Sequence, residues 1–480
     1  MLSTHAWHVR RNNRHGRQFI FGLLLLLCVL LLPPRAMSQT LPGAPGAKVS
    51  ELTPKPGFFT EPSSAVNSHN PRQVVVAYQD NAHIAYSLDA GEHWENASGV
   101  EPPDYRVSGD VSVTFDKHGH AMLCYMAFDK LGTFNYWAHN ATRNGLFVRR
   151  SLDGGKTWEH DHIAIIQHPT QPGIPWEDKP YIVADDSNGP YAGNLYVGWT
   201  RWTLENSQIL LARSTDDGRT WSGPLEVNKV RGLPRDDSGA LEGFSGAVGP
   251  DSTLYVVWSD ADHVVLTFSK GGGRSFETPR GIIPIAPAMF HVQAVSRANG
   301  FPVIAIDPRT GRLYVVWSDY RNGDVDVFCS TSDDHGLTWT AAVRVNSDPV
   351  HDGADQFFPW LAVDPLSGAA FVIFYDRRGD PDNRETTVTL ARSADGGKSF
   401  INYAWTQKPF DPREVFMGDY TGIAVWDSRV YGAWTEKPLM PMSDDTVVRV
   451  GVADFKALLA AESRRRTMTS GNSLISASGN

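Results

Sequence analysis

The chain has 480 residues, a formal net charge of −9 and three cysteines. The acidic balance argues against nucleic-acid binding. Three cysteines are too few for a disulfide-stapled scaffold.

Residues 1–38 have the features of a secretory signal peptide. Arginines at positions 10, 11, 14 and 17 precede an apolar run of 14 residues, Phe19–Leu32, and Ala36-Met37-Ser38 offers small residues for cleavage near Ser38. A membrane span needs about 20 apolar residues, so an uncleaved anchor is the weaker alternative. Cleavage removes five Arg and no acid, which leaves a net charge of −9 − 5 = −14. We therefore expect an acidic protein that is secreted or periplasmic.

An eight-residue pattern, SxDxGxxW, recurs along the chain after residue 80. Its copies begin at Ser87, Ser151, Ser214, Ser269, Ser332 and Ser393, at steps of 64, 63, 55, 63 and 61 residues. The copy at Ser269 is degenerate, with Gly271 where Asp is expected. A period of this length suits one four-stranded unit per repeat.

Each repeat also contains apolar runs upstream of the pattern, such as NLYVGWTR, TLYVVWSD and AAFVIFYD. Val, Tyr, Trp and Ile bounded by Gly, Pro and Asp are typical of β-strands. We read each unit as strand A, turn, strand B, loop, strand C, the SxDxGxxW hairpin and strand D. The body of the chain is therefore predicted to be all-β.

We interpret the SxDxGxxW hairpins as structural. The Asp can accept backbone hydrogen bonds, the Gly can supply a positive φ, and the aromatic residue can fold back onto the sheet. Six copies cannot all be one active site. The residues concerned in the five regular copies are Ser87, Asp89, Gly91, Trp94, Ser151, Asp153, Gly155, Trp158, Ser214, Asp216, Gly218, Trp221, Ser332, Asp334, Gly336, Trp339, Ser393, Asp395, Gly397 and Phe400.

These hairpins resemble Asp-box, or BNR, repeats, and residues 57–454 resemble a β-propeller of the sialidase superfamily. The resemblance implies four-stranded antiparallel blades and suggests glycoside hydrolase activity. Sialidases carry an Arg in an FRIP-like motif on the first inner strand, but here that strand reads FFTEPSSAV, without Arg. The arginine triad of sialidases cannot therefore be carried over.

We predict a single propeller with seven blades. Six blades, the number typical of sialidases, is the alternative. DYTGIAV, RVYGAWTE and VVRVGVADF supply three strands after the last hairpin. Residues 39–56 are a linker whose stretch around Lys48 to Thr53 can supply the missing outer strand and close the ring.

The strand order places the B–C loops and the starts of the A strands on the face opposite the SxDxGxxW hairpins. Several acids lie at or near those starts and would meet around one channel mouth, where they would raise each other's pKa. They are Glu61, Asp110, Glu177, Asp178, Glu242 and Asp419, with Tyr420 beside the last. Of these we select Asp178, Glu242, Asp419 and Tyr420 as catalytic candidates. A solvated rim, or a cation in the channel, is the alternative.

The B–C loops of the same face add basic and aromatic side chains that suit a sugar with an acidic group. We predict a substrate-binding set of Arg201, Arg321, Arg377, Arg378 and Trp202 from these loops, together with Trp176 from the start of an A strand. The alternative is that each Arg pairs with a neighbouring Asp on the surface.

Two classes of function remain open. One is a glycoside hydrolase of the exo-sialidase type acting on extracellular glycans, and the other is a non-catalytic propeller that binds a glycan or a protein. We predict no cofactor, no metal site and a monomer whose partner is a glycan or glycoconjugate. Cys124 and Cys329 lie in units across the ring and should not be bonded. Residues 455–480 are predicted to be a short helix and a disordered tail.

Overall fold

The computed structural model describes residues 40–460, apart from residues 80, 98–104, 130–142, 172, 236–238, 287–288, 407 and 439–444. The predicted signal peptide and most of the predicted C-terminal tail lie outside the described residues. Residues 456–460 are helical. In the described part of the chain, no helix is long and apolar enough to cross a membrane.

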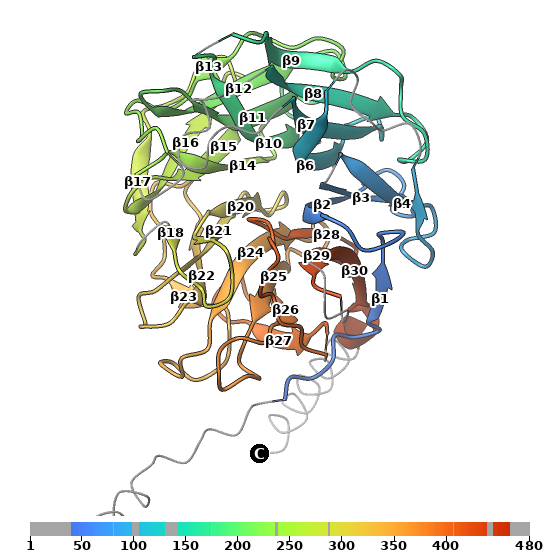
Figure 1. Cartoon of the computed structure of the whole chain (residues 1–480), viewed down its shortest axis with the longest axis vertical. Helices are drawn as coiled ribbons and strands as arrows, with labels where there is room; N and C mark the ends of the chain where they lie inside the picture. Colours follow the sequence, from blue (N-terminus) through green and yellow to red (C-terminus); the bar gives the residue numbers. More distant parts are fainter. Residues whose placement is uncertain are drawn as a thin grey trace, which may run out of the picture. The chain divides into compact units, whose positions relative to one another are not determined.

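Seven sheets of four antiparallel strands each stand around a ring (Figure 1). Blades 1 and 2 consist of β2 (Thr60–Val66), β3 (Val74–Gln79), β4 (His83–Ser87), β5 (Glu95–Asn96), β6 (Val107–Phe115), β7 (Ala121–Phe128), β8 (Asn144–Ser151) and β9 (Ile163–His168). Blades 3 and 4 consist of β10 (Trp176–Ala184), β11 (Leu195–Trp202), β12 (Ser207–Ser214), β13 (Leu225–Glu226), β14 (Glu242–Val248), β15 (Leu254–Ser259), β16 (His263–Ser269) and β17 (Arg280–Pro284).

Blades 5 and 6 consist of β20 (Val303–Ile306), β21 (Leu313–Asp319), β22 (Asp326–Ser332), β23 (Val343–Arg344), β24 (Gln356–Val363), β25 (Ala370–Asp376), β26 (Thr387–Ser393) and β27 (Ile401–Ala404). Blade 7 consists of β28 (Gly422–Trp426), β29 (Arg429–Glu436), β30 (Val447–Asp454) and the N-terminal strand β1 (Lys48–Glu51). The seven-bladed prediction is confirmed, and the six-bladed alternative is excluded.

The N-terminal strand closes the ring. β1 pairs antiparallel with β30, with Lys48 opposite Val452 and Glu51 opposite Arg449. It is therefore the outermost strand of the last blade, next to the strand that ends the propeller. The two ends of the described fold are joined by backbone hydrogen bonds rather than by side-chain contacts alone.

The core lies within and between the blades. Strands B and C are buried along almost their whole length, as in β15 (LYVVWS) and β21 (LYVVWSD), in which every residue is buried. Both faces of a blade pack against neighbouring blades, so these strands are nearly continuous apolar runs rather than alternating ones.

The SxDxGxxW hairpins connect strands C and D of blades 1 to 6. In the hairpin of blade 2, Ser151 Oγ donates to Asp153 Oδ1 at 2.8 Å and accepts from Gly155 N at 2.8 Å. Asp153 Oδ1 also accepts from Thr157 N at 2.9 Å, and Trp158 Nε1 donates to the Gly155 carbonyl at 3.0 Å. Every polar group of the pattern is thus used to hold the turn, which agrees with its structural interpretation.

The Gly of the hairpin also allows each turn to pack closely against the preceding blade. Gly155 has a φ of +96°, and a Cβ there would lie 2.3 Å from Val75 Cγ1 of blade 1. Likewise a Cβ at Gly218 would lie 2.4 Å from Met122 Cε of blade 2. A larger residue is therefore excluded both by the backbone conformation and by the contact with the neighbouring blade.

A small hairpin interrupts the regular series between blades 4 and 5. It pairs β18 (Met289–Phe290) with β19 (Ala298–Asn299). The repeat pattern does not predict it. It carries Arg297, a residue of the candidate site described below.

Cys124 lies on β7 of blade 2 and Cys329 on β22 of blade 5. Both are buried and free, as the ring order predicts.

Candidate functional site

The candidate site lies at the innermost strand, strand A, of several blades. Five of these inner strands are irregular at equivalent positions. The register shifts between Thr60 and Ser63 in β2, and equivalent shifts occur in β6, β10, β14 and β24. Each shift contains a residue with positive φ, namely Glu61, Asp110, Lys179, Gly243 and Phe358. Bulges of this kind redirect side chains and are common next to functional sites.

Glu61 and Asp110 are linked at the mouth of the central channel, the end at which the inner strands begin. The side-chain amide of Gln79 donates from Nε2 to Glu61 Oε2, and Gln79 Oε1 accepts from Asp110 N at 3.1 Å. Glu61 is only 2% exposed. Its second oxygen, Oε1, accepts from Asp419 N at 3.1 Å, which brings blade 7 to the same place.

Tyr420 contacts both an acidic and a basic side chain of this cluster. Its hydroxyl donates to Asp110 Oδ1 at 3.3 Å. The ammonium of Lys179 lies 3.8 Å from the centroid of the Tyr420 ring and 5.0 Å from that of Phe301. An ammonium over an aromatic face is attracted by the ring quadrupole. Within the described residues, these ring contacts are the direct contacts of the Lys179 ammonium.

Asp419 is paired with Arg297 of the β18–β19 hairpin. Arg297 Nε donates to Asp419 Oδ1 at 2.8 Å, and the second guanidinium nitrogen binds the other carboxylate oxygen. Asn299 Nδ2 donates to the Asp419 carbonyl at 3.2 Å. The hairpin therefore fixes the backbone and side chain of the residue that precedes Tyr420.

The electrostatics of the cluster favour neutral forms of Glu61 and Tyr420. Burial, and then the charges of Asp110 and Asp419, raise the pKa of Glu61 well above 4.5. Burial, and then Asp110, raise the pKa of Tyr420 well above 10. Two acidic side chains, Asp110 and Asp419, and two basic ones, Lys179 and Arg297, surround Glu61. The cluster thus places a carboxyl group whose neutral form is favoured beside a second carboxyl group.

A cavity in the channel adjoins this cluster. Its lining residues come from five inner strands and from the loop before β28: Ser63, Val111, Lys179, Pro180, Tyr181, Phe244, Trp360 and Tyr420. Trp360 packs against both Tyr181 and Tyr420, with ring centroids 5.8 and 5.6 Å apart. The polar groups of Lys179 and Tyr420 therefore meet an aromatic wall in this cavity.

The catalytic candidates from the sequence are brought together only in part. Asp419 and Tyr420 belong to the cluster. Asp178 precedes Lys179 on β10, and its Oδ2 accepts from Trp202 Nε1 at 2.8 Å. Glu242 is buried at the start of β14.

The candidate substrate-binding residues are held by their own neighbours. Trp176 and Trp202 are fully buried. Arg201 binds the buried carboxylate of Glu177, with Nε 2.8 Å from Oε1. Arg321 binds Asp319, and Arg378 binds Asp376.

Arg377 differs from the other arginines because it is 0% exposed and binds carbonyls. Its NH1 donates to the carbonyls of Gln293 and Asn383 at 2.7 and 2.8 Å. Its guanidinium lies 5.1 Å from the centroid of the Phe357 ring. Ligand contact by the four arginines stays a prediction.

Lys179 and Arg297 are the site residues that our sequence reasoning missed. Lys179-Pro180 repeats the placement of Glu61-Pro62 and Phe358-Pro359 at the inner-strand bulges, so aligning the repeats on these X-Pro pairs could have found it. Arg297 lies on a hairpin outside the repeat, and no periodic signal marks it.

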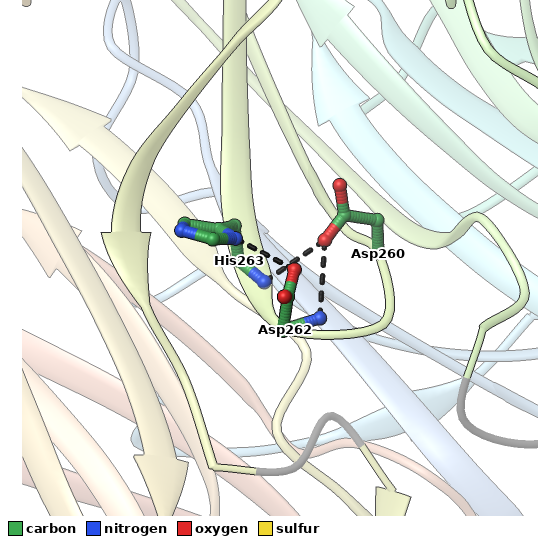
Figure 2. Close-up of side chains that lie close together, drawn as sticks. All are labelled: Asp260, Asp262 and His263. Carbon is green, nitrogen blue, oxygen red and sulfur yellow. Dashed lines mark hydrogen bonds and ion pairs between the residues drawn. The ribbon is translucent and has the colours of Figure 1, made fainter.

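One further group of potential metal ligands, Asp260, Asp262 and His263, lies in the exposed turn between β15 and β16 (Figure 2). Asp260 Oδ1 accepts from the backbone nitrogens of Asp262 and His263 at 3.2 and 2.9 Å. His263 Nδ1 lies 2.6 Å from Asp262 Oδ1. These contacts account for the cluster as a hydrogen-bonded turn.

The fold and the site define a seven-bladed β-propeller with a carboxylate and tyrosine cluster at the mouth of its channel. No protein-family model matches the chain. A curated sialidase of Bacteroides fragilis (strain YCH46) is 24% identical over 286 residues, which is 52% of this chain and 47% of that protein. The chain thus spans about half the length of this relative.

Solved structures with a similar chain path include glycoside hydrolases. A Hadza microbial sialidase has a TM-score of 0.48 and 18% identity, over 80% of this chain and 74% of that one. An α-L-arabinofuranosidase of Fusarium graminearum has a TM-score of 0.46 and 15% identity, over 74% and 95% of the two chains. The chain is therefore a seven-bladed β-propeller that is similar in sequence, over about half of its length, to a sialidase.

Proposed function

We propose that this protein is a secreted or periplasmic glycoside hydrolase of the sialidase type that acts on extracellular glycans at the channel mouth. The observation that carries the proposal is the hydrogen bond from Tyr420 to Asp110 beside the buried Glu61. The sequence match to a sialidase supports it. On this proposal the SxDxGxxW hairpins are Asp boxes that build the ring and take no part in the reaction.

The cluster supplies the groups that a retaining mechanism needs. The Tyr420 oxygen attacks the anomeric carbon while its proton passes to Asp110, and Glu61 gives its proton to the departing glycosidic oxygen as that bond breaks. Water then attacks the same carbon, loses its proton to the Glu61 carboxylate and releases Tyr420, which regains its proton from Asp110. The raised pKa of Glu61 suits a group that begins as the acid.

The predicted arginines would serve as outer contacts for an acidic group on the glycan. The side chains of Arg321 and Arg201 are 29% and 19% exposed, whereas that of Arg378 is 6% exposed. Because Arg377 is fully buried, we assign ligand contact first to Arg321 and Arg201. Each would contribute a charge-assisted hydrogen bond of about 1.5 to 3 kcal/mol.

A specific observation favours the second candidate, a propeller that binds glycan without cleaving it. Glu61 and Tyr420 are only 2% and 6% exposed. A ligand bound at the rim of the channel would therefore contact neighbouring side chains rather than the carboxyl of Glu61 or the hydroxyl of Tyr420. A panel of chromogenic glycosides and a glycan array, applied to the same preparation, separate the two candidates. Turnover of a glycoside supports the hydrolase, and binding on the array without turnover of the same sugar supports the second candidate.

A further inference from the structure

A group of carboxylates outside the channel cluster lies where blades 5 and 6 meet. Asp324 and Asp326 come from the loop between β21 and β22 and from the start of β22. Asp348 and Asp352 come from the connection between β23 and β24, and Asp376 ends β25. The proposed hydrolase uses none of them.

Three of these five carboxylates are paired with basic neighbours. Arg344 NH1 lies 3.2 Å from Asp326 Oδ1, and Arg378 Nε lies 2.7 Å from Asp376 Oδ2. Arg378 also lies 3.5 Å from Asp348. Two guanidinium groups are therefore the charged partners of these three carboxylates. Asn346 adds hydrogen bonds, since its Nδ2 donates to Asp326 and Asp348 at 2.6 and 2.8 Å.

The other two, Asp324 and Asp352, form no ion pair within 4.0 Å in the described part of the chain. Arg344 and Arg378 act on Asp352 only from a greater distance, and Asp352 Oδ1 accepts from Ala354 N at 2.9 Å. Asp324 is 5% exposed, and its Oδ1 is buried without a hydrogen-bond partner among the described residues. Its Oδ2 accepts from Gly353 N at 2.8 Å, so the carboxylate lies against the loop that carries Asp352.

This arrangement is costly without a counter-ion. Burial, and then the charges of Asp326 and Asp352, raise the pKa of Asp324 above 3.8. A buried carboxylate oxygen without a partner loses its hydration and regains nothing. Hard divalent cations such as Ca²⁺ bind carboxylate and carbonyl oxygens and retain water, so two carboxylates from two loops are a suitable core of a site.

We propose that Asp324 and Asp352 bind a divalent cation of the Ca²⁺ class, which clamps the loop before β22 to the loop before β24. Backbone carbonyls and water complete its coordination. The site lies at the junction of two blades, so the cation holds blade 5 against blade 6. Its role is structural and independent of whether the channel cleaves a glycan.

The test uses the whole mature protein, freed of metal with a chelator and then exchanged into chelator-free buffer. Thermal unfolding and calorimetric titration are followed as CaCl₂ is added, with NaCl at equal ionic strength as the reference. The variants are Asp324→Asn, Asp352→Asn and, as the matched control, Asp260→Asn from the exposed turn in Figure 2. That turn is the competing place for a cation, because its three ligand groups lie within 4.8 Å of one another.

We expect Ca²⁺ to raise the melting temperature of the wild type and of Asp260→Asn. Asp324→Asn and Asp352→Asn should each lose at least about tenfold in Ca²⁺ affinity, because a charged ligand is removed. Metal-free Asp324→Asn should melt no lower than metal-free wild type, since the unpaired charge is gone. If Asp324→Asn fails to fold, the exposed Asp352→Asn decides alone. The proposal is wrong if the wild type gains nothing from Ca²⁺, if the gain persists in these two variants, or if Asp260→Asn loses it.

Discussion

The hydroxyl of Tyr420 lies 3.3 Å from Oδ1 of Asp110, although 310 residues separate them in the chain. The two residues belong to the inner edges of blades 7 and 2, and Glu61 of blade 1 lies between these blades in the ring. Every inner strand begins at the same end of the channel, so closure of the ring by β1 and β30 brings the first and last blades into one site. The chemistry that we propose depends on that closure.

The first prediction concerns the hairpin glycine. Gly155→Ala should destabilise the fold by about 2 to 4 kcal/mol, because it adds an overpacked contact with Val75 to the strain of a positive φ. Gly193→Ala is the matched control, since Gly193 has a φ of +92° but nothing within 4 Å of an added Cβ. It should cost about 1 kcal/mol. Equal losses in urea unfolding would show that the contact between blades contributes nothing.

The second prediction concerns pH and Glu61. Its pKa is raised well above 4.5 in the folded protein, so the stability that it contributes is complete below about pH 4.5 and is lost as the pH rises through the folded pKa. Glu61→Gln removes this titration. The stability of Glu61→Gln relative to wild type should therefore rise with pH, by at most about 1.4 kcal/mol per pH unit.

Urea unfolding of both proteins at several pH values measures this difference. A stability difference that stays constant from about pH 4 to about pH 8, or that falls, would contradict the raised pKa. Asp334→Asn is a control of opposite sign, because hydrogen bonds from Thr338 lower the pKa of Asp334 to about 2. Its stability relative to wild type should fall as the pH rises from about 2 to about 4, and should stay nearly constant from there to about pH 8.

The third prediction separates two of the arginines. Arg321→Met should weaken binding of an acidic glycan about 10- to 150-fold at little cost in stability, because its guanidinium is partly exposed. Arg377→Met should instead lower the free energy of unfolding by about 2 to 4 kcal/mol, because it leaves two buried carbonyls without their donor. Calorimetric binding and urea unfolding of both variants check this. Loss of binding in a stable Arg377→Met protein would reverse the assignment.

The fourth prediction concerns the two buried cysteines, Cys124 and Cys329. Folded protein should react very slowly with a thiol reagent, because both thiols are buried and burial raises the pKa of Cys329 to about 12. Protein prepared without residues 1–38 should show two thiols per chain when denatured, from Cys124 and Cys329. Rapid labelling of the folded protein would mean that blade 2 or blade 5 opens.

The repeats made most of the fold predictable. Their spacing and the three strands after the last hairpin predicted seven blades, and the unpaired outer strand of the last blade pointed to the segment at Lys48. Strand order then placed Asp419 and Tyr420 at the channel mouth. These inferences succeed because every blade obeys the same local rules of turn and strand chemistry.

The rest of the site depends on departures from the repeat. Arg297 reaches Asp419 only because the β18–β19 hairpin is inserted between two regular blades. The sequence also could not give the partners of the arginines: Arg201 meets the buried Glu177, whereas Arg377 meets carbonyls. A side chain's partners are set by the packing of whole blades, which residue type and spacing alone do not specify.

The central claim is that Tyr420, paired with Asp110, is the reactive group of a glycoside hydrolase. It is tested most directly by the turnover of the best chromogenic glycoside by wild type, Tyr420→Phe and Tyr181→Phe, each shown to be folded. Tyr181 lines the same cavity but serves as the control, because it packs against Trp360 and is assigned no part in the reaction. We predict that Tyr420→Phe loses about 10³-fold or more in kcat while Tyr181→Phe stays within about tenfold of wild type. Turnover by Tyr420→Phe at the wild-type rate, or no turnover of any glycoside by the wild type, would contradict the claim.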